Sequence, residues 1–237
     1  MTDQVRREPV GRIGVVVALP GELGELRGQL EPRRSPGGRE YWAGELGGRE
    51  VLAIVAGVGK VCAAAAATVL VEAGVPGGLL SIGVCGGLRP RQRVGDLVHC
   101  TRAVQADLAV RATRECEPNP SLLRAWERVV PGRRGWFLTA DRPALSAYRR
   151  LRLARAYGGD PVAEMETAAI AAVAQASGLP WAALRAISDA LDLASAGLGR
   201  RASFRANYPA QAGRAAASLP ALFVELARDE SPSGTRG

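Results

Sequence analysis

The chain has 237 residues, 47% of them hydrophobic, and carries a net charge of +8. This length and composition favour one sizeable core, so we expect a single domain over residues 1–228 and a disordered tail over residues 229–237. No apolar run is long enough to span a membrane and the N-terminus is polar, which excludes a membrane-spanning protein and predicts a cytoplasmic one without a signal peptide.

Residues that bind metals or act as nucleophiles are sparse. The four cysteines lie far apart and form no CxxC pair, so neither a zinc site nor a disulfide framework is expected. His99 is the only histidine and lies in an apolar strand pattern, where a structural role is favoured over nucleophilic catalysis. We therefore expect no metal and no other cofactor.

The positive charge comes almost entirely from arginine, because Lys60 is the only lysine. The arginines are scattered and are not interleaved with aromatic residues, so a solvated surface is favoured over a nucleic-acid-binding one. Association with an anionic membrane has no support beyond this charge.

The N-terminal stretch predicts a strand followed by a helix. Gly11–Ala18 is apolar except at Arg12, as a buried parallel strand requires. After a Leu-Pro-Gly turn, a short amphipathic helix is expected to begin near Glu22. Glu22 thus follows a strand, where α/β proteins place their ligand crevice. The alternative is a surface glutamate in the first turn of a helix.

The middle of the chain alternates between strands and helices. A Gly-Val-Gly-Lys turn before one long alanine-rich helix lacks the glycine spacing of a Walker motif, so a tight strand-to-helix turn is favoured there. The glycines from Gly83 to Gly87 indicate backbone exposed to a ligand or to another segment. The predicted strands are Glu40–Gly44, Glu50–Ala56, Gly78–Gly83, Leu97–Val104 and Gly135–Leu138. The predicted helices are Val61–Ala73, Ser121–Val130 and Pro143–Tyr157, and Gln105–Pro120 is expected to be a loop.

Two acidic sites flank the last strand of the pattern. Glu164-Met165-Glu166 precedes a predicted helix over Thr167–Ser177, and a strand over Trp181–Ile187 ends in Ser188-Asp189. Carboxylates at these two places face the same volume in an α/β protein, and such a pair can divide the work of breaking a glycosidic bond. The alternative is structural, with Glu166 at the positive end of a helix dipole and Asp189 capping a turn.

A final helix is predicted over Pro209–Arg228. Together the elements predict a three-layer α/β/α sandwich with a mixed, largely parallel central sheet.

Several motifs occur in an order that resembles the nucleoside phosphorylase and nucleosidase superfamily, and most closely its methylthioadenosine/S-adenosylhomocysteine nucleosidase branch. The resemblance covers about residues 12–205. The segments that carry it are Ile13-Gly14-Val15-Val16-Val17-Ala18 with Glu22, Gly57-Val58-Gly59-Lys60, Gly83 to Gly87 with Val94-Gly95-Asp96, Thr139-Ala140-Asp141, Glu164-Met165-Glu166-Thr167-Ala168 and Arg185-Ala186-Ile187-Ser188-Asp189.

The resemblance implies a role for each matching residue. Asp189 would protonate or hydrogen-bond N7 of the leaving base, and Ser188 would orient it. Glu166 would accept hydrogen bonds from the ribose diol while Met165 packs on the sugar. Glu22 and Arg185 would position and deprotonate the attacking water. The remaining expected site residues are Glu164, which would support the water, and Val84, Gly86, Asp141 and Phe204, which would line the substrate pocket.

Water is favoured over phosphate as the nucleophile. Glu22 would repel phosphate, and Val84 replaces a residue that carries a hydroxyl group in both branches of the family. Hydrolysis of a 5′-modified purine nucleoside follows, with phosphorolysis as the alternative. The resemblance also implies a homodimer and a small-molecule nucleoside as partner.

Two departures leave the substrate open. The loop from Gln105 to Pro120 is shorter than in the family, and Arg142-Pro143 replaces an aromatic that would stack on the base, with Phe204 or Trp136 as possible substitutes. A futalosine-type nucleoside or adenosylhopane therefore stays open as substrate, as does a nucleoside-binding protein that has lost turnover.

Overall fold

The computed structural model describes residues 11–110, 114–144, 146–191 and 200–230. In chain order the strands are β1 (Ile13–Val17), β2 (Glu31–Arg34), β3 (Glu40–Leu46), β4 (Arg49–Val55), β5 (Leu79–Gly87), β6 (Leu97–Gln105), β7 (Glu115–Cys116), β8 (Arg133–Thr139), β9 (Val162–Glu164) and β10 (Trp181–Asp189). The helices are η1 (Pro20–Gln29), α1 (Lys60–Glu72), α2 (Pro120–Val129), α3 (Ala147–Ala156), α4 (Thr167–Ala176), α5 (Arg200–Gln211), η4 (Ala216–Ser218) and α6 (Leu219–Glu230).

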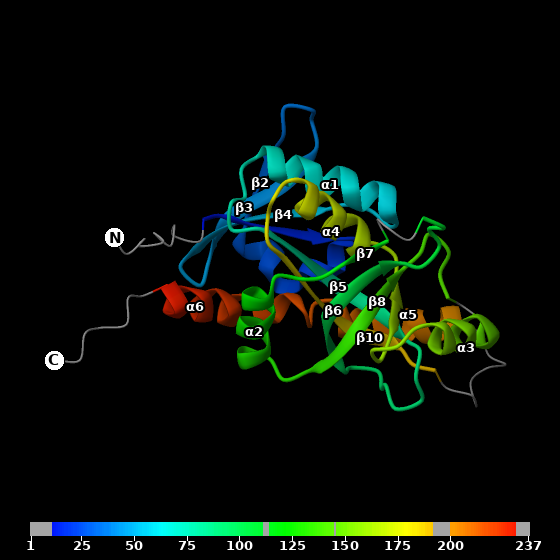
Figure 1. Ribbon diagram of the computed structural model, residues 1–237. Coiled ribbons are helices and arrows are strands. Elements are labelled where there is room, and N and C mark those ends of the chain that lie inside the picture. Colours follow the sequence, from blue (N-terminus) through cyan, green and yellow to red (C-terminus); the bar gives the residue numbers. More distant parts are fainter. Residues whose placement is uncertain (1–10, 111–113, 145, 192–199, 231–237) are drawn as a thin grey trace, which may run out of the picture.

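The described strands form one continuous sheet that curls back on itself at one side (Figure 1). Its order is β10-β6-β8-β9-β5-β1-β4-β3-β2, with β7 paired to β6, and β10 also pairs with β5, which closes a ring of five strands. The expected mixed sheet is confirmed, and its parallel and antiparallel pairings are equally frequent among the described strands.

Helices cover both faces of the sheet, as the predicted sandwich requires. Along β1, Val15 and Val17 face a cluster that includes Trp126 of α2 and Phe223 of α6. Val16 faces the other way, into a cluster shared with α1 and α4. Successive strand side chains point to opposite faces, so a strand buried on both sides must be apolar throughout.

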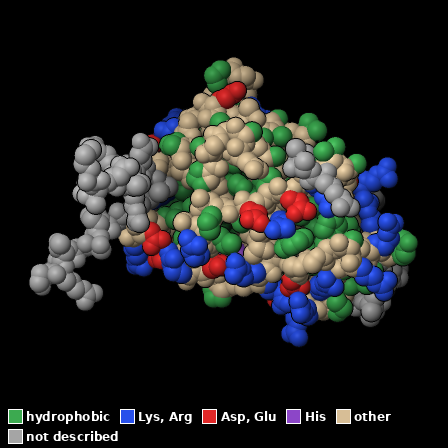
Figure 2. Space-filling view, in the orientation of Figure 1, with side chains coloured by type: hydrophobic (Ala, Val, Ile, Leu, Met, Phe, Trp, Pro, Cys, Tyr) green, Lys and Arg blue, Asp and Glu red, His purple; other side chains and the backbone are tan. Residues whose placement is uncertain are grey.

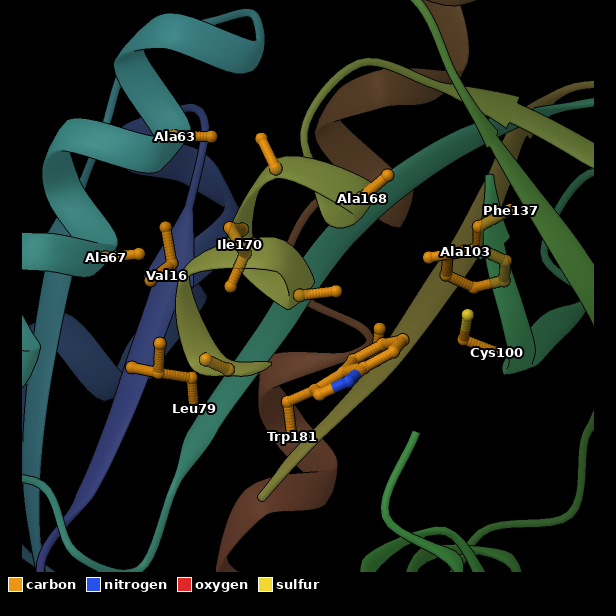
Figure 3. Packing of buried hydrophobic residues seen from close by; sticks show 14 of the residues in the cluster. Val16, Ala63, Ala67, Leu79, Cys100, Ala103, Phe137, Ala168, Ile170 and Trp181 are labelled. Atoms are coloured by element: carbon orange, nitrogen blue, oxygen red, sulfur yellow. The ribbon is translucent and has the colours of Figure 1, made fainter. Parts of the chain in front are cut away.

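The layer made by α1 and α4 is built largely from alanine. Ala63 and Ala67 of α1 and Ala168 and Ile170 of α4 pack over Val16 and neighbouring strand residues (Figure 3). Small side chains let the two helices approach each other and the sheet closely, so this side of the sheet supports the start of α4 firmly. Glu166 is the N-cap residue of α4 and is held at that point.

Two helical predictions are wrong in detail. The segment after β1 is a 3₁₀ helix, not an amphipathic α-helix, and Gly24 interrupts it with a φ of +55°. The predicted helix over Pro209–Arg228 is instead the end of α5, a break, η4 and α6. A Cβ on Gly213, in that break, would lie 3.1 Å from Cα of Gly24, so the two segments cross with backbone against backbone.

Several other elements are not indicated by the sequence pattern. Strands β2, β7 and β9 and helix α5 were not predicted, and the expected loop from Gln105 to Pro120 contains β7. Short strands carry too few residues to show a period, and they exist because a neighbouring strand pairs with them. The expected tail lies outside the described residues except for Asp229 and Glu230, which end α6.

Candidate active site

A cavity of about 370 Å³ opens where the carboxyl ends of β1, β5 and β10 meet. These three strands are parallel, so their ends lie at one edge of the sheet. The cavity is lined by residues from η1, from the end of β5, from the start of α4, from β10 and from α5. Segments far apart in the sequence therefore meet in one small volume, as expected at the edge of an α/β sheet.

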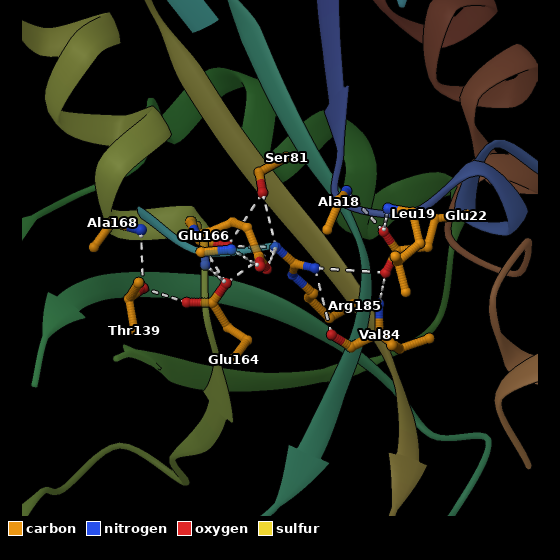
Figure 4. A network of polar contacts seen from close by, with 12 residues as sticks. Ala18, Leu19, Glu22, Ser81, Val84, Thr139, Glu164, Glu166, Ala168 and Arg185 are labelled. Atoms are coloured by element: carbon orange, nitrogen blue, oxygen red, sulfur yellow. Dashed lines mark hydrogen bonds and ion pairs between the residues drawn. The ribbon is translucent and has the colours of Figure 1, made fainter. Parts of the chain in front are cut away.

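Arg185 is the centre of the polar network in this cavity, and it is 1% exposed. Its Nη2 lies 3.0 Å from Glu164 Oε2 and 3.4 Å from Glu166 Oε2. The same nitrogen donates to Ser81 Oγ at 3.2 Å, while Nη1 lies 3.9 Å from Glu22 Oε1 (Figure 4). Three carboxylates thus surround one guanidinium, so the group carries net negative charge when all are ionised.

Glu22 reaches the cavity from η1 and is held by backbone N–H groups. Its Oε2 accepts from Ala18 N at 2.8 Å and from Leu19 N at 2.9 Å, and its Oε1 accepts from Val84 N at 3.0 Å. Burial raises the pKa of this carboxyl, although Arg185 and these N–H groups oppose the shift. A carboxylate with a raised pKa is suited to accept a proton near neutral pH.

Glu166 lies across the network from Glu22. Its Oε1 accepts a hydrogen bond from Gly59 N at 3.0 Å, which ties it to the turn before α1. Burial raises the pKa of Glu166 to about 7; Arg185 opposes the shift and the Glu164 carboxylate adds to it. Its ionisation therefore falls within the working range of most enzymes.

Glu164 is enclosed by protein partners. Its Oε1 accepts from Thr139 Oγ1, and its Oε2 accepts from Glu166 N at 2.9 Å and Thr167 N at 2.8 Å in addition to Arg185. The carboxylate thereby satisfies free N–H groups at the start of α4. Glu164 lines the cavity, but its hydrogen bonds serve Arg185 and the helix.

Asp189 lies at the end of β10 and forms a buried ion pair. Its Oδ2 contacts Arg150 Nη2, and Ser188 Oγ lies 3.2 Å from its Oδ1. Arg150 of α3 also donates to two backbone oxygens, Gly87 O at 3.0 Å and Ala144 O at 2.6 Å. The Asp189 carboxylate is therefore fixed in place by a guanidinium.

The structure brings most of the expected site residues together. Both expected catalytic residues and all but one of the expected substrate-binding residues line the cavity: Glu22, Val84, Gly86, Glu164, Met165, Glu166, Arg185, Ser188, Asp189 and Phe204. Asp141 is not among the lining residues. It is exposed, and its Oδ1 accepts from Lys60 N at 3.2 Å.

Of the two aromatic substitutes, only Phe204 lines the cavity. Trp136 is not among the lining residues, and the Arg102 guanidinium lies 4.7 Å from the centre of its ring. The expectation for Trp136 is therefore wrong: it shares a face of β8 with Leu138, which does line the cavity, but it lies two residues further from the carboxyl end of the strand.

His99 has the structural role that was expected. It is buried, and its Nε2 lies 2.9 Å from Val130 O. Within the residues that the structure describes, no three His, Cys, Asp or Glu side chains are placed to hold a metal ion. None of the described helices is long and apolar enough to cross a membrane.

Two residues of the site were missed. Arg150 lies on the same helical face as Ala154, one turn away. An arginine within an apolar stripe of a helix indicates a buried charge, and this pattern could have identified Arg150 from the sequence. Gly83 is the other, because a Cβ there would lie 2.5 Å from Arg185 Nη1 and closer still to Glu22 Oε1. The glycine-rich strand end showed that backbone was exposed there but not to which side chains.

The surface around the site is of mixed charge. Figure 2 shows Lys and Arg side chains dispersed among acidic and apolar ones on one face, and not gathered in a single patch. At the cavity, Arg142 and Arg205 are exposed lining residues.

Comparisons with known proteins agree with this arrangement. A family model described as the phosphorylase superfamily matches residues 12–223. S-adenosylhomocysteine nucleosidase from Streptococcus pyogenes, in complex with 5-methylthiotubericidin, superposes with a TM-score of 0.82 at 23% identity over 93% of this chain and 99% of that one. Futalosine hydrolase from Helicobacter pylori gives 0.79 at 25% identity over 90% and 97%.

A third solved structure is the 5′-methylthioadenosine/S-adenosylhomocysteine nucleosidase of Helicobacter pylori, in complex with a pyrrolidinol compound. It superposes with a TM-score of 0.79 at 26% identity, over 91% of this chain and 98% of that one. The expected family resemblance and the expected fold are thus confirmed, and the similarity covers almost all of each chain.

Proposed function

This chain belongs to the phosphorylase superfamily, and from that premise we propose that it hydrolyses the N-glycosidic bond of a 5′-modified purine nucleoside and releases the free base. The substrate class is that of methylthioadenosine and S-adenosylhomocysteine. The observation that supports this most directly is the position of Glu22, a buried carboxylate 3.9 Å from Arg185 that lines the same cavity as Glu166.

The charge around Arg185 supports water over phosphate as the nucleophile. Glu22, Glu164 and Glu166 leave no free positive charge on Arg185, the guanidinium that they share. Phosphate would approach an excess of negative charge there, whereas a neutral water would not be repelled. In the proposed mode Glu22, whose pKa is raised by burial, takes the proton of that water.

The same negative charge stabilises the transition state of hydrolysis. As the bond to the base breaks, positive charge develops on the sugar, and nearby carboxylates stabilise it. In the proposed mode, Glu166 accepts hydrogen bonds from the ribose hydroxyls and Met165 packs on the sugar. Glu164 is a positioning residue that holds Arg185 and the start of α4.

Asp189 is assigned to the base, with Ser188 orienting it. Negative charge develops on the base as it leaves, so a proton or a hydrogen bond at N7 lowers the barrier. The apolar lining from Val58, Leu138, Pro143 and Leu153 suits a purine ring and an apolar 5′ substituent. A futalosine-type nucleoside is the second candidate, since one similar structure is that of a futalosine hydrolase.

To test this proposal, the purified protein is incubated with a panel of 5′-modified adenosines and futalosine-type nucleosides. Each is run with and without phosphate, and free base and sugar products are measured. We expect base release independent of phosphate, with the free pentose as product. Ribose 1-phosphate formed only with phosphate would show a phosphorylase, and binding without any base release would show a nucleoside-binding protein.

A further inference from the structure

Arg150 is a buried arginine that reaches the base end of the cavity from α3. It is 3% exposed and lines the cavity together with Asp189 and Gly86. A lone buried guanidinium would be costly, and this one is compensated by Asp189 and by backbone carbonyls. Its position is therefore built into the site, and it is not a surface arginine folded inward.

Most of its N–H groups have protein partners. Nε donates to Ala144 O, and Nη1 donates to Gly87 O at 3.0 Å and to Asp189 O at 3.3 Å. Nη2 donates to Asp189 Oδ2. A guanidinium carries five N–H donors, so one N–H of Nη2 has no partner among the described residues.

Gly86 gives that nitrogen its access to the cavity. A Cβ on Gly86 would lie 2.9 Å from Arg150 Nη2 and 3.4 Å from Asp189 Oδ2. Because glycine stands there, the ion pair borders the cavity without a side chain between. The base end thus offers one charged donor, Arg150 Nη2, beside one charged acceptor, the Asp189 carboxylate.

On the basis of the proposed hydrolase function, we infer that Arg150 is a catalytic residue that donates a hydrogen bond to N7 of the departing purine. Asp189 then acts on N7 only through Arg150, as its counter-ion, and accepts from the exocyclic amino group of the base. A 6-aminopurine presents that combination, an acceptor at N7 beside an N–H donor on the 6-amino group. A guanidinium stays protonated at all working pH values, so it stabilises charge and transfers no proton.

The step balances with water alone. The bond between C1′ and N9 breaks and its electron pair stays with the base, while the water oxygen bonds to C1′. Glu22 takes the proton of that water and later returns it to solvent. The base leaves as an anion that is hydrogen-bonded to Arg150, and it gains its proton from solvent on release.

The test measures the cleavage of two substrates with different leaving groups by the variant Arg150→Met. The matched control is Arg155→Met, which changes an exposed arginine of the same helix. We expect kcat on 5′-methylthioadenosine to fall by about 10²- to 10³-fold with KM changed less than about fivefold. Cleavage of p-nitrophenyl β-ribofuranoside should stay within about fivefold of the wild type, because nitrophenolate leaves as a stable anion without a donor. Arg155→Met should match the wild type on both.

A kcat of Arg150→Met on methylthioadenosine close to that of the wild type overturns the inference, because Asp189 would then be sufficient for departure of the base without Arg150. Equal losses on both substrates also overturn it, because they indicate a structural role. If Arg150→Met does not fold, the same two substrates are compared in Arg150→Lys. Lysine keeps the charge but loses the paired donors of the guanidinium, so the loss should again fall on methylthioadenosine and not on the nitrophenyl substrate. A wild-type chain that cleaves neither substrate contradicts the proposed function itself.

Discussion

Nη1 of Arg185 lies 3.9 Å from Oε1 of Glu22, and both residues are 1% exposed. Arg185 is on β10 and Glu22 on the 3₁₀ helix after β1, and these strands flank β5 on opposite sides. The closeness of the two side chains therefore depends on the pairing of all three strands. It brings the proposed proton acceptor into the same network as the proposed ribose-binding carboxylate.

Glu22→Gln should stop hydrolysis and spare binding. The amide keeps the shape of the side chain but cannot take the proton of water, so kcat should fall by at least about 10²-fold while inhibitor binding stays within about tenfold. Turnover kinetics and calorimetry with a nucleoside analogue measure the two quantities. Glu25→Gln, an exposed glutamate of the same helix, is the control and should be unchanged. Hydrolysis at the normal rate in Glu22→Gln would remove Glu22 from the mechanism.

Asp189→Asn should also lower kcat, by at least about 10²-fold, with ligand binding kept within about tenfold. The neutral amide no longer compensates the charge of Arg150. The arrangement of charged groups at the base is therefore disturbed, while the shape of the cavity is kept. Base release from methylthioadenosine and binding of a non-hydrolysable analogue measure the effect. Full activity in this variant would show that base departure does not depend on Asp189.

Gly83→Ala should remove activity through Glu22 and Arg185. The added Cβ would lie within 2.5 Å of Arg185 Nη1 and even closer to Glu22 Oε1, so both groups must move. We expect a loss of at least about 10²-fold in kcat/KM. Gly74→Ala is the control, because a Cβ there meets no atom within 4 Å although its φ is also positive, at +83°. Equal activity in Gly83→Ala and Gly74→Ala would contradict the prediction.

Glu166 should make the protein less stable as the pH rises. Its pKa is raised from 4.5 to about 7 by burial, so the folded state holds a proton that the unfolded state has lost between these values. This stabilisation is complete below about pH 4.5 and is lost as the pH rises through about 7, a change of about 3 kcal/mol.

Unfolding in urea from about pH 5 to about pH 8 measures this effect. Glu166→Gln should unfold with a smaller dependence on pH, because it removes the titrating group, and it should be more stable than the wild type at the alkaline end. The pKa of Glu22 is raised in the same direction, so part of the dependence should remain. An unchanged pH dependence in Glu166→Gln would contradict the assignment.

Lys60→Met should raise KM about three- to tenfold and leave kcat within about twofold. Lys60 Nζ lies 2.6 Å from Asp107 Oδ1 and 3.5 Å from Asp141 Oδ2, which fixes the turn whose Gly59 N–H holds Glu166. Loosening that turn should weaken ribose binding without touching the reacting atoms. Steady-state kinetics decide, and Asp107→Asn should act in the same direction. Unchanged KM in both variants would show that the contact has no part in binding.

Much of the fold could be predicted because it depends on local pattern. The apolar run of β1, the alanine-rich helices and the small-residue turns each carry their own signal, and the expected elements appear close to the expected residues. The errors lie where tertiary contacts override that signal. The final helix breaks at Gly213 because the backbone of Gly24 crosses there, and β7 and β9 are too short to show a period.

The sequence by itself determined which strand ends carry carboxylates and in what order, since residue type and position along a strand are properties of the chain. Only the tertiary structure decided which partner each charge has. Arg150 and Asp189 form a pair because Arg150 reaches from α3 to the end of β10, and Asp141 binds Lys60 outside the cavity because β8 ends at its rim. Electrostatic interactions depend on distance and burial in space, and neither is set by separation along the chain.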